Sequence, residues 1–188
     1  MMEAAKPLIM VVDDHPAVLE VVRVTLEREG YQVWAATHGQ HALERLEAAL
    51  ARRRQRGDFG GETKYLPDLI VSDIMMPVMD GYEFYKETRA NPYLNHIPFI
   101  FLTAKLEDED IRYGKELGVD DYLTKPIQSD DLLASVRGKL RRVSQQRTLA
   151  AQVMGEPDKP SVVGVMILII LVLLIIFATV VITVIWVG

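Results

Sequence analysis

The sequence VSDIMMPVMDG occupies residues 71–81, after an apolar run that begins at Leu69 and before a helical pattern that begins near Tyr82. The apolar run predicts a buried strand, so we expect Asp73 at the point where that strand passes into a loop. Ligands of open parallel sheets bind at this edge, outside the carboxyl ends of the strands. A carboxylate there can be a metal ligand, a nucleophile or a helix cap, and only its partners distinguish these roles.

Composition narrows the classes of function. The chain of 188 residues has room for one domain of ordinary size and an appendage. It contains no cysteine, which excludes disulfides, thiolate metal sites and cysteine nucleophiles. The net charge of -5 argues against nucleic acid as the main partner, and we expect no contact with DNA.

Strand and helix patterns alternate along residues 8–143. Short apolar runs predict strands at 8–12, 31–35, 69–72, 97–102 and 122–123, and helical periodicity predicts helices at 16–29, 40–51, 82–89, 107–117 and 129–143. This alternation is the signature of an α/β fold, a doubly wound five-stranded parallel sheet with helices on both faces. We expect the polar stretch 52–66 to be a frayed helix end followed by a solvated loop.

Side chains that can do chemistry follow the ends of four predicted strands. Asp13 and Asp14 follow the first strand, Asp73 the third, Thr103 the fourth and Lys125 the fifth. Because the carboxyl ends of parallel strands share one edge, we expect these side chains in one shallow pocket. Three crowded carboxylates repel one another unless a cation joins them, and Mg²⁺, with oxygen ligands and retained waters, fits best. The Lys125 ammonium and the Thr103 hydroxyl suit phosphoryl oxygens.

These residue types together indicate a phosphoryl-transfer site with Asp73 as the nucleophile, because an aspartate can form an acyl phosphate. The chain has no P-loop glycine pattern, so we expect the donor to be another phosphorylated molecule. Each residue taken singly has a structural alternative; Asp13 and Asp14, for example, can cap the next helix. The four histidines, among them His15, show no metal-ligand spacing and are expected at the surface or in turns.

The motifs as a set resemble the receiver domain of two-component response regulators. They are the acidic pair Asp13–Asp14, the Asp73 segment with Met76–Pro77 and Asp80–Gly81, the triplet Leu102–Ala104 and the stretch Asp121–Pro126. The resemblance covers residues 7–142 and implies a flavodoxin-like strand order, 2-1-3-4-5. It also implies that Asp73 accepts a phosphoryl group from a sensor histidine kinase or a phosphotransfer protein.

The resemblance further implies how Mg²⁺ is bound. Asp14 and Asp73 would coordinate the ion directly, together with the backbone carbonyl of Met75. Asp13 would act largely through water. Apart from its own phosphorylation and the hydrolysis of its acyl phosphate, we expect no stand-alone enzymatic activity.

Other roles implied by the resemblance concern signalling. Thr103 and Lys125 would hold the phosphoryl oxygens, and Tyr122 would swing inward once Thr103 moves. The peptide bond between Lys125 and Pro126 would be cis, a rare feature usually found in tight turns. Related regulators often dimerise through the fourth helix, fifth strand and fifth helix, which makes this face a candidate for a homodimer.

The segment Val162–Val187 carries no charged side chain. As a helix it would be about 39 Å long at about 1.5 Å per residue, against a hydrocarbon core of about 30 Å, so it predicts one tilted transmembrane helix. Residues 143–161 are expected to be a basic helix end and a linker. Basic residues before the span satisfy the positive-inside rule and place the receiver on the cytoplasmic side of the inner membrane. They are Arg137, Lys139, Arg141, Arg142 and Arg147.

The first hypothesis is therefore a membrane-anchored, single-domain response regulator that signals through the surface of its receiver. Two alternatives remain at this stage. One is an adaptor that brings a partner to the membrane without being phosphorylated. The other is a phosphate sink that hydrolyses its own acyl phosphate.

Overall fold

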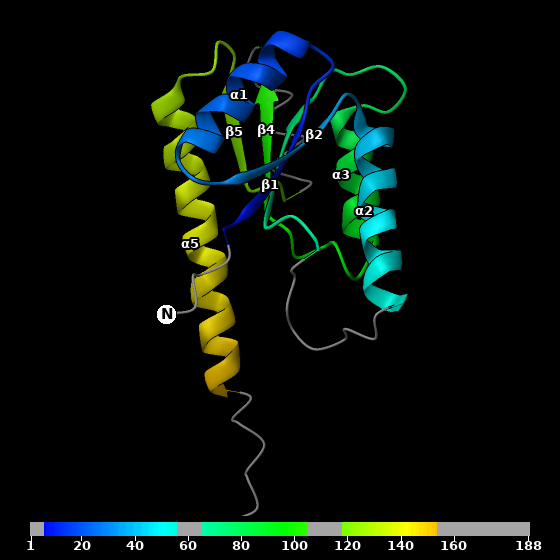
Figure 1. The fold of residues 1–188 in the computed structure, drawn as a ribbon, viewed down its shortest axis with the longest axis vertical. Helices are drawn as coiled ribbons and strands as arrows, with labels where there is room; N and C mark the ends of the chain where they lie inside the picture. Colours follow the sequence, from blue (N-terminus) through cyan, green and yellow to red (C-terminus); the bar gives the residue numbers. More distant parts are fainter. Residues whose placement is uncertain (1–5, 56–64, 105–117, 154–188) are drawn as a thin grey trace, which may run out of the picture. The chain divides into compact units, whose positions relative to one another are not determined.

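The computed structural model describes residues 6–55, 65–104 and 118–153 (Figure 1). The helix predicted at 107–117 and the segment Val162–Val187 lie outside these ranges. The described elements, in chain order, are β1 (Leu8–Val12), α1 (Pro16–Arg28), β2 (Gln32–Ala36), α2 (Gly39–Gln55), β3 (Leu69–Asp73), α3 (Gly81–Ala90), β4 (Phe99–Thr103), β5 (Asp121–Thr124) and α5 (Ser129–Val153).

The five strands form one sheet in the order β2-β1-β3-β4-β5, and every neighbouring pair is parallel. Both the predicted fold class and the predicted strand order are confirmed. Strands β1, β3 and β4 are buried along their whole length, because helices cover both faces of the sheet. This is why these strands appear in the sequence as continuous apolar runs.

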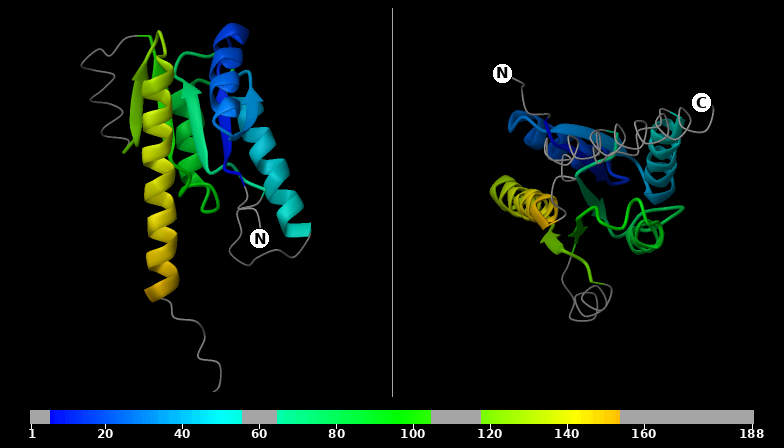
Figure 2. Two further views of the ribbon diagram at one scale, coloured as in Figure 1. Left: turned by 60° about the vertical axis from the view of Figure 1, so that its left-hand side comes forward. Right: turned by 90° about the horizontal axis from the view of Figure 1, so that it is seen from below.

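Alternate strand residues pack into two separate cores, one on each face of the sheet. On one face, Met10 and Phe99 pack with side chains of α2 and α3, such as Leu46. On the other face, residues such as Ile9 pack with side chains of α1 and α5, such as Leu26. Figures 1 and 2 show the same arrangement, with α1 and α5 on one side of the sheet and α2 and α3 on the other.

The observed boundaries differ from the predicted ones by a few residues, except at the end of α5. Helix α2 continues to Gln55, so the arginines at 52–54, predicted to lie in a frayed helix end, are helical. Helix α1 begins at Pro16 and is followed by Gly30, whose φ of 88° is a conformation that favours glycine. Helix α5 runs on to Val153. No helix in the described part of the chain is long and apolar enough to cross a membrane.

Candidate functional site

The ends of four strands bring the predicted site residues to one edge of the sheet. Asp13 directly follows β1, Asp73 is the last residue of β3, and Thr103 is the last residue of β4. The register pairs Asp73 with Leu102, and Thr103 with Thr124. The ladder therefore fixes the height of each side chain along the sheet, which is why residues far apart in sequence converge.

Lys125 lies between two of the carboxylates. Its Nζ donates to Asp13 Oδ2 at 2.7 Å and lies 3.0 Å from Asp73 Oδ2. Burial lowers the pKa of Lys125, but the hydrogen bonds and negative charges of Asp13 and Asp73 outweigh this effect, so its pKa lies above the usual value. Lys125 is therefore a cation at neutral pH and holds the two carboxylates together.

The Asp73 carboxylate is almost entirely buried, with 4% of the residue exposed. Its Oδ1 accepts a hydrogen bond from the Ile74 backbone N–H at 2.9 Å. Burial raises the pKa of Asp73; Lys125 and the Ile74 amide offset part of the rise, and the charge of Asp13 adds to it. The charged form of Asp73 is thus destabilised in the absence of a further cation.

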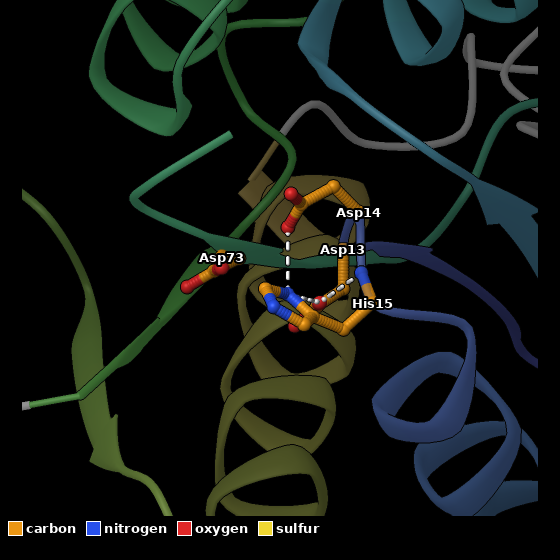
Figure 3. A group of neighbouring side chains, drawn as sticks. All are labelled: Asp13, Asp14, His15 and Asp73. Carbon is orange, nitrogen blue, oxygen red and sulfur yellow. Dashed lines mark hydrogen bonds and ion pairs between the residues drawn. The ribbon is translucent and has the colours of Figure 1, made fainter. Parts of the chain in front are cut away.

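Three carboxylates and one imidazole form a group that can hold a metal ion (Figure 3). One ligand atom from each of Asp13, Asp14, His15 and Asp73 lies within 4.8 Å of the other three. The carboxylates carry three negative charges and Lys125 supplies one positive charge. Two negative charges therefore remain, and one divalent cation would balance them. Oxygen donors in this number suit Mg²⁺, so the residues present fit the predicted ion. The Met75 carbonyl remains a predicted ligand.

An open cavity of about 510 Å³ lies over this edge of the sheet. Asp73, Thr103 and Lys125 line it, so the carboxylate, hydroxyl and ammonium face the same space. The loop after β3 supplies much of the remaining wall, and the exposed Met75 side chain is part of it. A small phosphorylated group can therefore approach Asp73 from solvent.

Thr103 and Tyr122, the two residues predicted to act as a switch, lie on neighbouring strands. Thr103 is buried, whereas the half-buried Tyr122 packs its ring against Phe101 with the ring centroids 5.6 Å apart. The Lys125 backbone N–H donates to the Thr103 carbonyl at 2.7 Å, and the Lys125–Pro126 peptide bond is cis, as predicted. This backbone contact ties Lys125 to the end of β4; the switch itself stays a prediction.

The loop between β3 and α3 folds back closely onto Asp73. The Gly81 N–H donates to the Ile74 carbonyl at 2.8 Å, and a Cβ added to Gly81 would lie 2.2 Å from the Asp73 carbonyl oxygen. Asp80 caps α3 by accepting a hydrogen bond from the Glu83 N–H at 2.8 Å, and the Glu83 side chain returns the contact. The Asp80–Gly81 pair therefore starts the helix and packs the loop against Asp73.

His15 is the residue that the sequence-based interpretation missed. It lies at the surface as predicted, with its side chain 67% exposed, but its Nδ1 is also 2.9 Å from Asp14 Oδ1 and 3.5 Å from Asp13 Oδ1. Its position directly after the acidic pair was the only available signal, because one histidine beside two aspartates matches no common metal-ligand spacing.

Comparisons with known proteins agree with this geometry. The family model described as "Response regulator receiver domain" matches residues 9–137. The chain is 38% identical to the alkaline phosphatase synthesis transcriptional regulatory protein PhoP of Bacillus subtilis over 71% of the chain and 48% of that protein. It is 36% identical to the DNA-binding dual master transcriptional regulator RpaA of Synechocystis over 74% of the chain and 51% of that protein.

Solved structures show the same fold. The chemotaxis response regulator CheY4 of Vibrio cholerae is 30% identical with a TM-score of 0.57, covering 72% of this chain and 99% of that one. A response regulator from Chloroflexus aurantiacus is 29% identical with a TM-score of 0.58, covering 73% and 99%. The chain belongs to the response regulator receiver domain family of two-component systems, whose members accept a phosphoryl group on an aspartate. It spans about half the length of the curated relatives that it matches.

Proposed function

We propose that Asp73 is the phosphoacceptor of a phosphorelay and that its donor is a sensor histidine kinase or a phosphotransfer protein. The observation that carries the proposal is a buried aspartate whose carboxylate lies 3.0 Å from a lysine ammonium and opens onto a cavity beside two further carboxylates. Burial of Asp13 and Asp73 around one cation, with the half-buried Asp14 beside them, is costly, and it is consistent with a site built to bind a further cation and a phosphoryl group.

The transfer exchanges one bond to phosphorus for another. A carboxylate oxygen of Asp73 attacks the phosphorus of the partner's phosphohistidine, a P–O bond forms, and the P–N bond breaks with its electron pair returning to the imidazole. Lys125 and Thr103 lie where an ammonium and a hydroxyl stabilise the charge on the transferred oxygens. Asp14, Asp73 and the Met75 carbonyl would hold Mg²⁺, which would supply further charge neutralisation, and Asp13 would act largely through water.

Signalling then depends on what the new oxygens attract. We propose that Thr103 moves toward the phosphoryl group and that Tyr122 turns inward into the space that Thr103 leaves. Attack of water on the acyl phosphate breaks its P–O bond, releases inorganic phosphate and restores the Asp73 carboxylate. If this hydrolysis is fast, the receiver acts as a phosphate sink.

The test is phosphorylation of the purified chain with acetyl phosphate and Mg²⁺, followed by intact-mass spectrometry. Wild type should gain one phosphoryl group and Asp73→Asn should gain none. Asp130→Asn is the matched control, because Asp130 is an exposed aspartate in the first turn of α5. Equal labelling of Asp73→Asn and wild type would refute the assignment.

We also propose that Val162–Val187 anchors the chain in the inner membrane as a single transmembrane helix with the receiver on the cytoplasmic side. The support is the uncharged apolar sequence of this segment and the exposed Arg141 and Arg142 before it. Two members of the predicted basic cluster have acceptors in the fold. Lys139 is buried and donates to the Asp120 carbonyl, and Arg137 pairs with Glu29.

Membrane anchoring is tested by fractionating cells that express the full chain or a chain lacking residues 162–188. The full chain should stay with the membrane after an alkaline wash that strips peripheral proteins, and the shortened chain should not. Recovery of the full chain in the soluble fraction would refute the anchor and leave the phosphoacceptor proposal intact.

The output of an anchored receiver would be a contact made by its surface, and the predicted homodimer face is one such surface, although its fourth helix lies outside the described residues. A phosphorylation-independent adaptor is distinguished by Asp73→Asn, which would then keep full function in cells.

Transcriptional control is the second candidate output. It is favoured by the names of the relatives, PhoP and RpaA, against our expectation of no DNA contact. Binding of the phosphorylated chain to promoter DNA would support it.

A further inference from the structure

His15 occupies the N-cap position of α1 but does not cap the helix. N-cap residues are usually Ser, Thr, Asp or Asn, whose side chains accept a hydrogen bond from the first turn. The His15 side chain makes no such bond, and Pro16 follows it at the start of the helix. The His15 side chain therefore does not stabilise the first turn of α1 by a hydrogen bond.

The imidazole is directed at the acidic group (Figure 3). Its Nδ1 lies 2.9 Å from Asp14 Oδ1, and the His15 backbone N–H donates to Asp13 Oδ1 at 2.9 Å. Lys125 contacts different carboxylate oxygens, namely Oδ2 of Asp13 and of Asp73. The Lys125 ammonium and the His15 imidazole therefore contact different carboxylate oxygens. The His15 side chain is 67% exposed. The imidazole reaches the group without displacing the lysine.

We infer that His15 is a ligand of the metal site and shifts its preference from Mg²⁺ toward Mn²⁺ and similar transition-metal ions. The inference rests on the proposed metal-assisted function and adds a nitrogen donor to its oxygen ligands. A ring nitrogen within 4.8 Å of oxygens of all three aspartates is close enough to share one ion with Asp14 and Asp73. An ion bound by Nδ1 and Asp14 Oδ1 would take the place of the hydrogen bond that joins these two atoms.

The chemical reason is the difference in softness between the two ions. Mg²⁺ keeps several waters and dehydrates reluctantly, so replacing one water by imidazole gives it little. Imidazole binds transition-metal ions more favourably, and affinity rises along the series that begins with Mn²⁺. His15 therefore strengthens Mn²⁺ binding selectively, whereas a residue that only oriented Asp14 would strengthen the binding of both ions.

The experiment measures Mn²⁺ and Mg²⁺ affinities by isothermal titration calorimetry on the full chain, stripped of metal and kept in detergent. His15→Asn is the main variant because asparagine is a favoured N-cap, and circular dichroism checks that it folds. His96→Ala is the control; His96 is exposed and precedes β4, at the opposite edge of the sheet. We expect His15→Asn to weaken Mn²⁺ binding about tenfold and to leave Mg²⁺ binding within about twofold.

The outcomes separate this inference from the proposed function. If wild type binds both ions and His15→Asn changes both affinities equally, or changes neither, the role of His15 is overturned and the receiver chemistry stands. If wild type binds neither ion, both proposals are overturned. A selective loss of Mn²⁺ affinity in His15→Asn, with no change in His96→Ala, supports the inference.

Discussion

Replacing Gly81 by alanine should destabilise the receiver, although alanine is the better helix former. Gly81 is the first residue of α3, where alanine is favoured over glycine by about 1 kcal/mol. The added Cβ, however, would lie 2.2 Å from the Asp73 carbonyl oxygen and 3.0 Å from the Ile74 Cα. Both are backbone atoms, so the loop must move, and no side-chain rotation can relieve the contact.

The magnitude follows from two costs and one gain. Overpacking a rigid contact costs about 1–3 kcal/mol. Moving the loop also weakens the hydrogen bond from the Gly81 N–H to the Ile74 carbonyl, which costs about 1 kcal/mol. Against a gain of about 1 kcal/mol from helix propensity, we expect a net loss of about 1–3 kcal/mol. The Asp73 carbonyl moves with the loop, so phosphorylation by acetyl phosphate should also slow.

Gly138 provides the matched control. It lies within α5, and a Cβ added there would meet nothing within 4 Å, so Gly138→Ala should raise the free energy of unfolding by up to about 1 kcal/mol. Urea unfolding followed by circular dichroism measures both variants on the same chain. A Gly81→Ala protein as stable as wild type would refute the reasoning, because the close packing of the loop on Asp73 would then be wrong.

Three further predictions concern charge and strain at the same edge of the sheet. In Mg²⁺-free buffer near neutral pH, Asp73→Asn should unfold at a higher urea concentration than wild type, because the raised pKa of Asp73 means that its charged form lowers the free energy of unfolding. This gain in stability should disappear below about pH 4, where Asp73 is protonated in both the folded and the unfolded wild type. Lys125→Gln should have the opposite effect and lower the free energy of unfolding by about 3 kcal/mol at neutral pH, since it leaves Asp13 and Asp73 without their shared cation. Val78 has a φ of 70°, a strained conformation for valine that glycine adopts freely. Val78→Gly should therefore stabilise the folded chain by about 1 kcal/mol in thermal unfolding, because the relief of strain exceeds the entropic cost of the more flexible unfolded chain.

Each of these predictions has an outcome that would contradict it. A neutral-pH destabilisation by Asp73→Asn would show that the ion pair with Lys125 outweighs the burial cost. A Lys125→Gln protein of unchanged stability would mean that water replaces the ammonium. A less stable Val78→Gly protein would show that the valine side chain contributes more packing than its backbone conformation costs, which is unexpected for a residue that is 80% exposed.

The sequence was sufficient to predict the fold because the three central strands, β1, β3 and β4, are buried on both faces. Such strands appear as unbroken apolar runs, and the helices between them have clear periodicity. The strand ends were predicted less exactly. Asp73 and Thr103 belong to their strands, since pairing with Leu102 and Thr124 continues the ladder through them. Long-range pairing sets these ends, and no local sequence signal reports it.

Side-chain pairing across the fold was the other limit of the sequence. Lys125 was assigned to phosphoryl oxygens, and only the structure shows that it also pairs with Asp13 at 2.7 Å. Lys139 is predicted to belong to a basic surface but lies buried beside the start of β5, where it donates to the Asp120 carbonyl. Both cases depend on where a long flexible side chain finds an acceptor, which is decided by elements distant in sequence.

Burial divides the site into a buried part, which we call the base, and an exposed part, which we call the rim. The two parts differ in how well they tolerate substitution. Asp13 and Asp73 are buried and take part in hydrogen bonds that also hold strands and loops in place, so their substitution alters chemistry and stability together. His15 and Met75 line the cavity beside them and are largely exposed, so they can change at little cost to the core. Phosphoryl transfer therefore depends on the base, whereas the choice of metal ion and of phosphodonor is expected to reside in the rim. Exchanging rim residues should change which partner phosphorylates the chain and leave its reaction with acetyl phosphate intact.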